Sequence, residues 1–274
     1  TGASGKPLCA HPKYVYNDGE RWDLLVTHDD SASRGVHRTD AVVLPAVAGT
    51  PGAQGTYWSS AVSVVNLIGT DREIDVLYTP RNKNGLTTYA AETIHLPARS
   101  QRSWTDILHE VFGVTGAGTL EFRGHQLAVT SRTSTPGADA GSYGQGIPPL
   151  QPDQVLSKAS TVSAAMGGVE EGKIFRTNLG LCEIWGEPVT VRITIFDQTM
   201  TELGHRNVAL RPYENTQINQ VAQSVGGTNS LTGGIVGVEV VSGTGRIGAY
   251  LSVVDNATGD PTFIAIAEQL PTGG

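Results

Sequence analysis

The sequence predicts an all-β protein built from two tandem β-sandwich modules, and three observations support this prediction. Val, Ile and Thr dominate the apolar and semi-polar runs, as is typical of strands. The 274 residues include 34 glycines and 14 prolines but only 16% charged residues, a composition rich in turns. Finally, the segments GTYWSSAVSVVN (55–66) and GKIFRTNLGLCE (172–183) open two stretches that resemble each other.

The two stretches match at spacings that drift along the chain. Three pairs are 117 residues apart: Trp58 with Phe175, Val62 with Leu179 and Val64 with Leu181. Three more are 113 residues apart: Leu108 with Val221, Phe112 with Val225 and Gly113 with Gly226. Ser131 and Ser252 are 121 residues apart. Such drift indicates loop insertions between equivalent elements. A duplicated scaffold favours a binding or structural role.

Residues 1–40 match neither module, yet they carry strand patterns. The runs 14–16 and 21–28 are typical of strands, and the turn signal NDG between them predicts a hairpin. An isolated hairpin is marginally stable in water, so we expect this leader to add to an exposed sheet edge, in its own chain or, preferably, in the next subunit. The residues expected to make this pairing are Tyr14, Tyr16, Trp22, Leu24 and Val26.

Module 1 is expected at residues 41–150. Pro45 confines its first segment to a sheet edge or a strand end, and the runs 56–66 and 72–80 predict an antiparallel pair. A helix is predicted at 103–112, capped by Ser103, with apolar residues at helical spacing and Gly113 at its end. The strands predicted after the helix are 118–124 and 126–133.

Module 2 is expected at residues 166–274, after a linker at 151–165. Its predicted helix at 216–225 repeats the first one more weakly, and strands are predicted at 234–243 and 246–255. This order of elements predicts a two-sheet sandwich with one short helix in a crossover of each module.

A family resemblance rests on three blocks of sequence, VVLPAVAGTPGAQGTYWSSAVSVVN, FRTNLGL and AYLSVVDNATGDPTF. They are similar to an uncharacterised tandem β-sandwich repeat of bacterial secreted and surface proteins, over residues 41–267. The resemblance implies an extracellular location and no enzymatic activity or established ligand. Cys182 departs from this pattern, since a plain apolar residue is usual there.

Composition limits the partners of the chain. The formal net charge is −7 and is spread along the sequence, so no basic stripe is present to bind nucleic acid. No apolar run approaches the roughly 20 residues needed to span a bilayer. The start, TGASGKPLCAHPK, is interpreted as a mature end after cleavage of an export signal. Cys9 and Cys182 either form a disulfide or stay as free or intermolecular thiols.

Two segments carry metal-ligand residue types. The first holds His28, Asp29, Asp30, His37 and Asp40, but the spacing matches no zinc pattern and a solvated loop is the preferred interpretation. The second places Asp255, Asn256 and Asp260 at a predicted hairpin tip, with oxygen atoms suited to calcium. A turn is preferred there as well, and no other cofactor is expected.

Two further motifs have structural interpretations. The segment GTGRIG (243–248) satisfies a dinucleotide-binding pattern formally, but a strand rather than a helix follows it, so a glycine-rich hairpin turn is predicted. Arg132 and Arg176 lie inside strand patterns and are predicted to anchor hydrogen bonds in the core.

The sequence contains no recognisable set of nucleophile, base and oxyanion donors, so we expect no catalysis. The preferred hypothesis is an extracellular structural protein that forms a homo-oligomeric fibre or surface assembly through its N-terminal segment. The alternatives are a calcium-dependent binding module and a surface adhesin that binds glycans without catalysis. Exposed aromatic residues for the adhesin are Tyr89, Tyr143, Trp185 and Tyr213.

Overall fold

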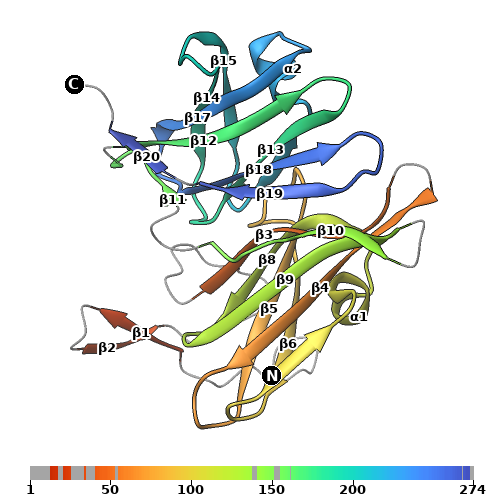
Figure 1. Cartoon of the computed structure of the whole chain (residues 1–274). Helices are drawn as coiled ribbons and strands as arrows, with labels where there is room; N and C mark the ends of the chain where they lie inside the picture. The colour runs from red at the N-terminus through yellow and green to blue at the C-terminus, as the bar shows by residue number, and fades with distance from the viewer. Residues whose placement is uncertain are drawn as a thin grey trace.

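The computed structural model describes residues 13–17, 21–25, 34, 41–52, 55–137, 141–150, 155–160, 162–266 and 268–271. Its regular structure is almost entirely β, with two short helices, which confirms the predicted all-β sandwich class. Figure 1 shows module 2 stacked on module 1. No helix in the described ranges is long and apolar enough to cross a membrane.

Module 1 contains two layers of strands around one apolar core. Its elements are β3 (Ala41–Pro51), β4 (Tyr57–Asn66), β5 (Arg72–Pro80), β6 (Ala90–Leu96), β7 (Gln101–Trp104), α1 (Ile107–Phe112), β8 (Gly116–Arg123), β9 (Leu127–Pro136) and β10 (Ser142–Gly146). One layer has the order β3-β8-β5-β6, and the other contains β7, β4, β9 and β10. The layers join where the last three residues of β3 pair with β4. Buried Leu44, Val64, Val76, Leu120 and Phe122 fill the space between them.

Module 2 repeats this plan with its two sheets separate. Its elements are β12 (Val162–Glu171), β13 (Phe175–Glu183), β14 (Val189–Phe196), β15 (Glu202–Leu210), β16 (Asn215–Ile218), α2 (Val221–Gly226), β17 (Leu231–Gly243), β18 (Ile247–Asp255) and β19 (Pro261–Ala265). One sheet has the order β15-β14-β17-β12-β20, where β20 is Glu268–Pro271. The other contains β16, β13, β18 and β19, and β11 (Val155–Leu156), from the predicted linker, pairs with β18.

The pairings of the two modules correspond strand by strand. In one layer, the pairs β3/β8, β5/β8 and β5/β6 of module 1 correspond to β12/β17, β14/β17 and β14/β15 of module 2. In the other layer, β4/β9, β4/β7 and β9/β10 correspond to β13/β18, β13/β16 and β18/β19. All of these pairs are antiparallel. The helices occupy equivalent crossovers, between β7 and β8 and between β16 and β17. The repeat seen in the sequence is therefore a repeat of topology.

Four of the predicted matches are one residue out of register. Val62 pairs with Ser131 while Leu179 pairs with Leu251, so Leu251 rather than Ser252 is equivalent to Ser131. The glycine that ends α2 is Gly227, with φ 69°, as Gly113 ends α1 with φ 63°. The helices are therefore 114 residues apart, and Leu108 and Phe112 correspond to Ala222 and Gly226. A one-residue slip in a strand exchanges its two faces, so these corrections decide which side chains are equivalent.

Both helices begin later than predicted because the residues before them form short strands. Ser103 lies in β7 opposite Ser63 and does not cap a helix. Asp106 is the N-cap of α1, and its side chain accepts a hydrogen bond from the backbone N–H of His109 at 3.3 Å. Glu110 accepts bonds from the N–H groups of Thr105 and Asp106, both at 2.8 Å, which fixes the entry to the helix.

The modules are joined by hydrogen bonds at both ends of their contact. At one end, the N–H of Asn82 donates to the carbonyl of Asn215 at 2.8 Å, and the Asn215 side chain donates to the Thr79 carbonyl at 3.1 Å. At the other end, the N–H of Gly144 donates to Asp260 at 2.9 Å. These bonds link β5, the β5–β6 loop and β10 of module 1 to the start of β16 and the β18–β19 turn of module 2.

Candidate functional site

A buried polar cluster lies where Arg34 of the leader meets both modules, and we call it the Arg34 socket. It consists of Arg34 with Thr79, Glu121, Arg123 and Tyr213. Arg34 is 3% exposed and Glu121 is 2% exposed. The guanidinium donates to Glu121 Oε2 from Nε at 2.9 Å and from a terminal nitrogen at 2.6 Å, and it also contacts Thr79 Oγ1. A single leader residue is thus held by groups far away in the sequence.

Arg123 completes the socket from the same strand as Glu121. Its Nε donates to Glu121 Oε1 at 2.8 Å, and its terminal nitrogen donates to the backbone carbonyl of Arg34. Burial raises the pKa of Glu121, but the charges and hydrogen bonds of Arg34 and Arg123 outweigh it, so the net pKa lies below its ordinary value. The socket therefore holds an ionised carboxylate that contacts both the side chain and, through Arg123, the backbone of the leader.

Tyr213 is the contribution of module 2 to the socket. The guanidinium carbon of Arg34 lies 3.8 Å from the centre of the Tyr213 ring, a cation–π distance. The Tyr213 backbone has a positive φ of 53°, and its N–H donates to Glu183 Oε2 at 2.7 Å. Because Tyr213 belongs to module 2 and Glu121 to module 1, Arg34 connects the two modules.

Glu183 is a second buried carboxyl and supports the loops around the socket. It accepts hydrogen bonds from four backbone N–H groups, those of Trp185, Gly186, Tyr213 and Arg246, at 2.7 to 3.1 Å. Burial raises the pKa of Glu183, and these four donors oppose that shift. All of these bonds are to backbone groups, so Glu183 fixes loop geometry.

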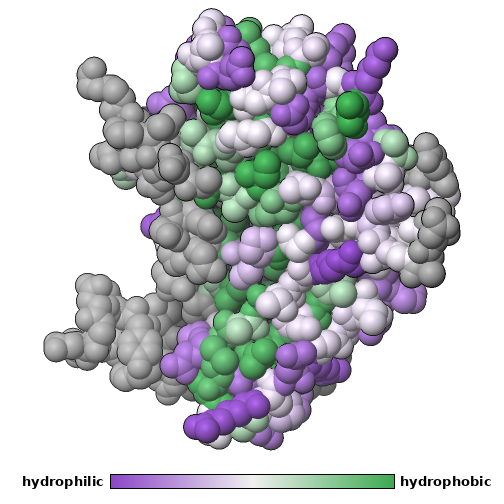
Figure 2. Space-filling view, viewed as in Figure 1, coloured by the Kyte–Doolittle hydropathy of each residue, from purple (hydrophilic) through white to green (hydrophobic). Residues whose placement is uncertain are grey.

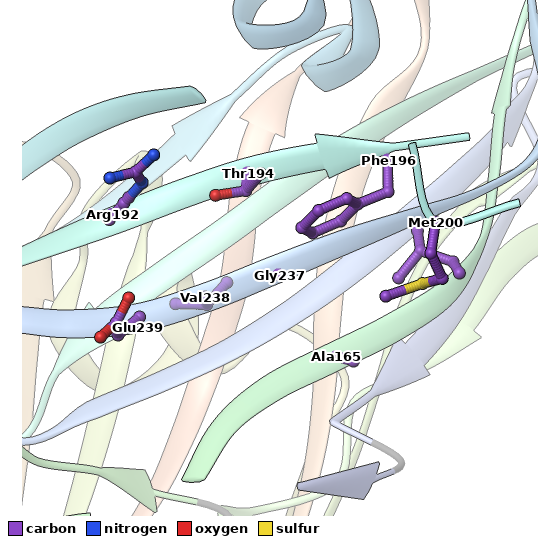
Figure 3. A pocket seen from close by; sticks show the side chains of 9 residues that line it. Ala165, Arg192, Thr194, Phe196, Met200, Gly237, Val238 and Glu239 are labelled. Atoms are coloured by element: carbon purple, nitrogen blue, oxygen red, sulfur yellow. The ribbon is translucent and has the colours of Figure 1, made fainter. Parts of the chain in front are cut away.

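The equivalent face of module 2 is open. In module 1, Leu77 of β5 pairs with Glu121 of β8, and the equivalent pair in module 2 is Thr194 of β14 with Gly237 of β17. Gly237 therefore stands at the position of Glu121, and Glu239 stands at the position of Arg123. This face carries a shallow depression of about 130 Å³ (Figure 3), lined by Ala165, Arg192, Thr194, Phe196, Met200, Ile235, Gly237, Val238 and Glu239. We call it the open face.

Glycine shapes the open face. A Cβ at Gly237 would lie 3.2 Å from Cε2 of Phe196, so the absence of a side chain lets the ring lie close to strand β17 (Figure 3). Met200 lies at the same end of the depression and is 48% exposed. Figure 2 shows patches of apolar and polar residues interspersed over the visible surface of both modules.

The charged end of the open face contains an unused carboxylate. Arg192 stands opposite Glu239 in the β14–β17 ladder, but its guanidinium is paired with Glu202 at 3.9 Å. Glu239 is exposed and makes no hydrogen bond or ion pair with any residue that the structure describes. A carboxylate that lines the same depression as a hydroxyl and an aromatic ring is therefore available to a cation.

The predicted hairpin of the leader is present. Strand β1 (Lys13–Asn17) pairs antiparallel with β2 (Arg21–Leu25), with Tyr14 opposite Leu24 and Tyr16 opposite Trp22. In the described part of the chain these strands pair only with each other. The predicted addition of Tyr14, Tyr16, Trp22 and Leu24 to another sheet edge therefore stays a prediction, and Val26 lies outside the described residues.

The cysteine pair stays a prediction as well. Cys182 is a free thiol with no exposed surface, and burial raises its pKa to about 12. Cys9 lies outside the described residues, so a bridge between the two is not tested.

The predicted calcium ligands serve as turn residues. Asp255 accepts bonds from the N–H groups of Ala257 and Thr258, at 2.7 and 2.9 Å. Asn256 donates to the Gly172 carbonyl at 3.0 Å, and Asp260 accepts from module 1. The described residues contain no group of three or more His, Cys, Asp or Glu side chains arranged for a metal. The residues 28–30, 37 and 40 lie outside the described ranges.

Three other interpretations change. Arg132 and Arg176 are not core anchors: Arg132 is exposed, and Arg176 is partly exposed and donates to Asn256 at 2.6 Å. The segment 243–248 is a turn, as predicted, but it crosses between the two sheets of module 2 and is not a hairpin. Of the aromatic residues proposed for an adhesin, Tyr213 is buried in the socket.

Comparison with known proteins adds little to these observations. No family model matches the chain, and no curated protein sequence matches it. A chain of the T13 IBDV viral particle is a similar solved structure, with 11% identity over 82% of this chain and 68% of that chain. Its TM-score is 0.19, too low to support an argument about fold or function.

Proposed function

We propose that this chain is an extracellular structural protein without catalytic activity, whose copies associate through the N-terminal hairpin. The observation that carries the proposal is the hairpin β1–β2, whose strands pair only with each other among the described residues. A two-stranded sheet of this kind is marginally stable alone and gains stability by adding to another sheet.

The Arg34 socket supports this proposal because it anchors the leader after the hairpin. Eight residues separate Leu25 from Arg34, and a chain of that length spans at most about 30 Å. The hairpin is therefore tethered to the body of its own chain within that distance of the socket. A tether of this length lets the hairpin contact a neighbouring copy without detaching from its own chain.

Two long edge strands offer acceptors for the hairpin. In the described sheets, β6 pairs only with β5 and β15 pairs only with β14. Strand β15 carries Glu202, His205 and Arg206 and a register irregularity, features that protect an edge against strand addition. Strand β6 has no register irregularity but also carries exposed Glu92 and His95, so both edges are partly protected and either can accept the hairpin.

Glu121 of the socket and the neighbouring buried Glu183 support a non-catalytic role. Both carboxylate oxygens of Glu121 accept hydrogen bonds from arginines, and both oxygens of Glu183 accept from backbone N–H groups. Groups engaged in this way stabilise loops and the contact between the modules.

The test compares the full chain with a chain that lacks residues 1–25, which removes the hairpin but keeps Arg34 in its socket. We expect the shortened chain to be monomeric in sedimentation experiments and to melt within a few degrees of the full chain, while the full chain forms larger species visible by electron microscopy. Association of the shortened chain at the same concentrations as the full chain would contradict the proposal.

A further inference from the structure

The two modules present the same sheet face in two states. In module 1 the face formed by β5 and β8 is covered by Arg34, which is held by a carboxylate, a hydroxyl and an aromatic ring from Glu121, Thr79 and Tyr213. In module 2 the equivalent face formed by β14 and β17 has no cover among the described residues. Equivalent faces of a duplicated scaffold are candidates for equivalent ligands.

The open face offers the same three kinds of group. Glu239 supplies the carboxylate, Thr194 the hydroxyl and Phe196 the aromatic ring, and all three line one depression (Figure 3). Glu239 occupies the position of Arg123, two residues along the strand from the position of Glu121. The carboxylate is therefore shifted along the strand but stays on the same face.

Because Glu239 forms no ion pair with the described residues, its carboxylate can bind a cationic group. The arginine opposite it in the ladder is engaged with Glu202 at 3.9 Å, and Figure 3 shows the Arg192 and Glu239 side chains directed apart. Of the two cationic side chains, arginine suits this site better than lysine, because its planar guanidinium stacks on an aromatic ring while it donates to a carboxylate.

We propose that the open face is an arginine-docking site, and that it takes Arg21 of the N-terminal hairpin from a second copy of this chain. This inference rests on the proposed association through the hairpin. Arg21 opens β2, opposite Asn17, and is the one arginine of residues 13–25. Arg34 is already held in the socket of its own chain, so it is not available to a neighbour.

The test measures self-association of the full chain by analytical ultracentrifugation. Arg21→Ala, Glu239→Gln and Phe196→Ala should each weaken association at least tenfold. Arg21→Lys should weaken it less than Arg21→Ala, because it keeps the charge but loses the stacking. Glu73→Gln, which removes an exposed carboxylate from the inner strand β5, is the matched control and should leave the dissociation constant unchanged, because the inference places the arginine contact at Glu239.

A charge exchange sharpens the test. A Glu239→Arg chain and an Arg21→Glu chain should each self-associate weakly, and a mixture of the two should recover association through the reversed pair. Unchanged association in Arg21→Ala and Glu239→Gln, or no recovery in the mixture, would overturn the inference.

The chain lacking residues 1–25 separates this inference from the proposed function. If that deletion abolishes association while the point substitutions do not, the hairpin joins the copies but does not use the open face. If the shortened chain associates as the full chain does, the proposed function fails and the inference fails with it.

Discussion

The two modules share one strand order, but the equivalent sheet face is covered in module 1 and exposed in module 2. In module 1, Glu121 and Arg123 lie on the outer face of β8 and are buried under Arg34. In module 2, Gly237 and Glu239 occupy these positions on β17, and Glu239 is exposed. The difference shows that the fold does not dictate what covers a face. A few side chains at equivalent positions decide whether the face is closed or left free for a partner.

The closed face requires charge pairing. A buried carboxylate that loses its partner leaves an uncompensated charge at low dielectric, which is costly. The two arginines beside Glu121 remove that cost and fix the leader between the modules. The open face contains no buried charge, so the fold does not need a bound partner there to avoid this cost.

The largest expected difference between the faces comes from removing the two carboxylates. Glu121→Ala leaves Arg34 and Arg123 buried without a counter-charge and should lower the free energy of unfolding by about 3–5 kcal/mol. Glu239→Gln should leave it unchanged, since the side chain is exposed and unpaired among the described residues. Urea denaturation of both variants and the parent chain measures this, and equal losses would refute the contrast.

Two glycines provide a second comparison. A Cβ at Gly118 of β8 would lie 2.0 Å from the backbone carbonyl oxygen of Thr79, whereas one at Gly237 of β17 would lie 3.2 Å from the Phe196 ring edge. We expect Gly118→Ala to cost about 1–3 kcal/mol, because backbone must shift, and Gly237→Ala to cost less, because a side chain can turn away. Thermal and urea unfolding distinguish them, and a larger loss for Gly237→Ala would contradict this account.

The third prediction concerns pH. The pKa of Glu121 is lowered in the folded state, so its ionisation stabilises the fold above the unfolded pKa of about 4.3. That contribution should be lost as the pH falls from about 5 through the folded pKa. Glu121→Gln should remove this step from the stability profile, while Glu239→Gln should retain it. Unfolding titrations at pH 2 to 7 measure the slopes, and an unchanged profile for Glu121→Gln would show that the socket does not titrate.

The smallest expected effect leaves stability untouched and concerns Cys182. Its thiol has no exposed surface and a pKa raised to about 12, so it should resist alkylation at pH 8 in the folded chain and react at once in urea. A Cys9→Ala variant isolates its signal in mass spectrometry. Rapid labelling of the folded chain would contradict the packing around β13.

The sequence predicted the class and the duplication because both depend on local patterns. Gly113 was identified as a helix end because only a left-handed residue fits there, and the structure gives it φ 63°. The start of the first helix is predicted at residue 103 but lies at Ile107. The difference arises because Trp104 fits the apolar spacing of a helix, whereas in the structure it is buried as the last residue of strand β7.

The socket was missed because its partners are distant in the sequence. Alternation along a strand shows which residues share a face but not what covers that face. Arg132 and Arg176 are therefore predicted in the core, whereas the arginines buried in the described part of the chain are Arg34 and Arg123. The available signal was the segment TLEFRG, in which Glu121 and Arg123 lie two positions apart on one strand face.

Oxidation of the two methionines tests most directly whether copies meet at the open face. Met166, in the core of module 2, has no exposed surface and serves as the internal reference, and Met200, on the open face, is 48% exposed. In hydroxyl-radical footprinting of dilute chain, Met200 should oxidise rapidly and Met166 slowly. At concentrations where the chain associates, Met200 should become protected while Met166 stays unchanged. Oxidation of Met200 at the same rate in the associated and dissociated chain would show that the open face is not where copies meet.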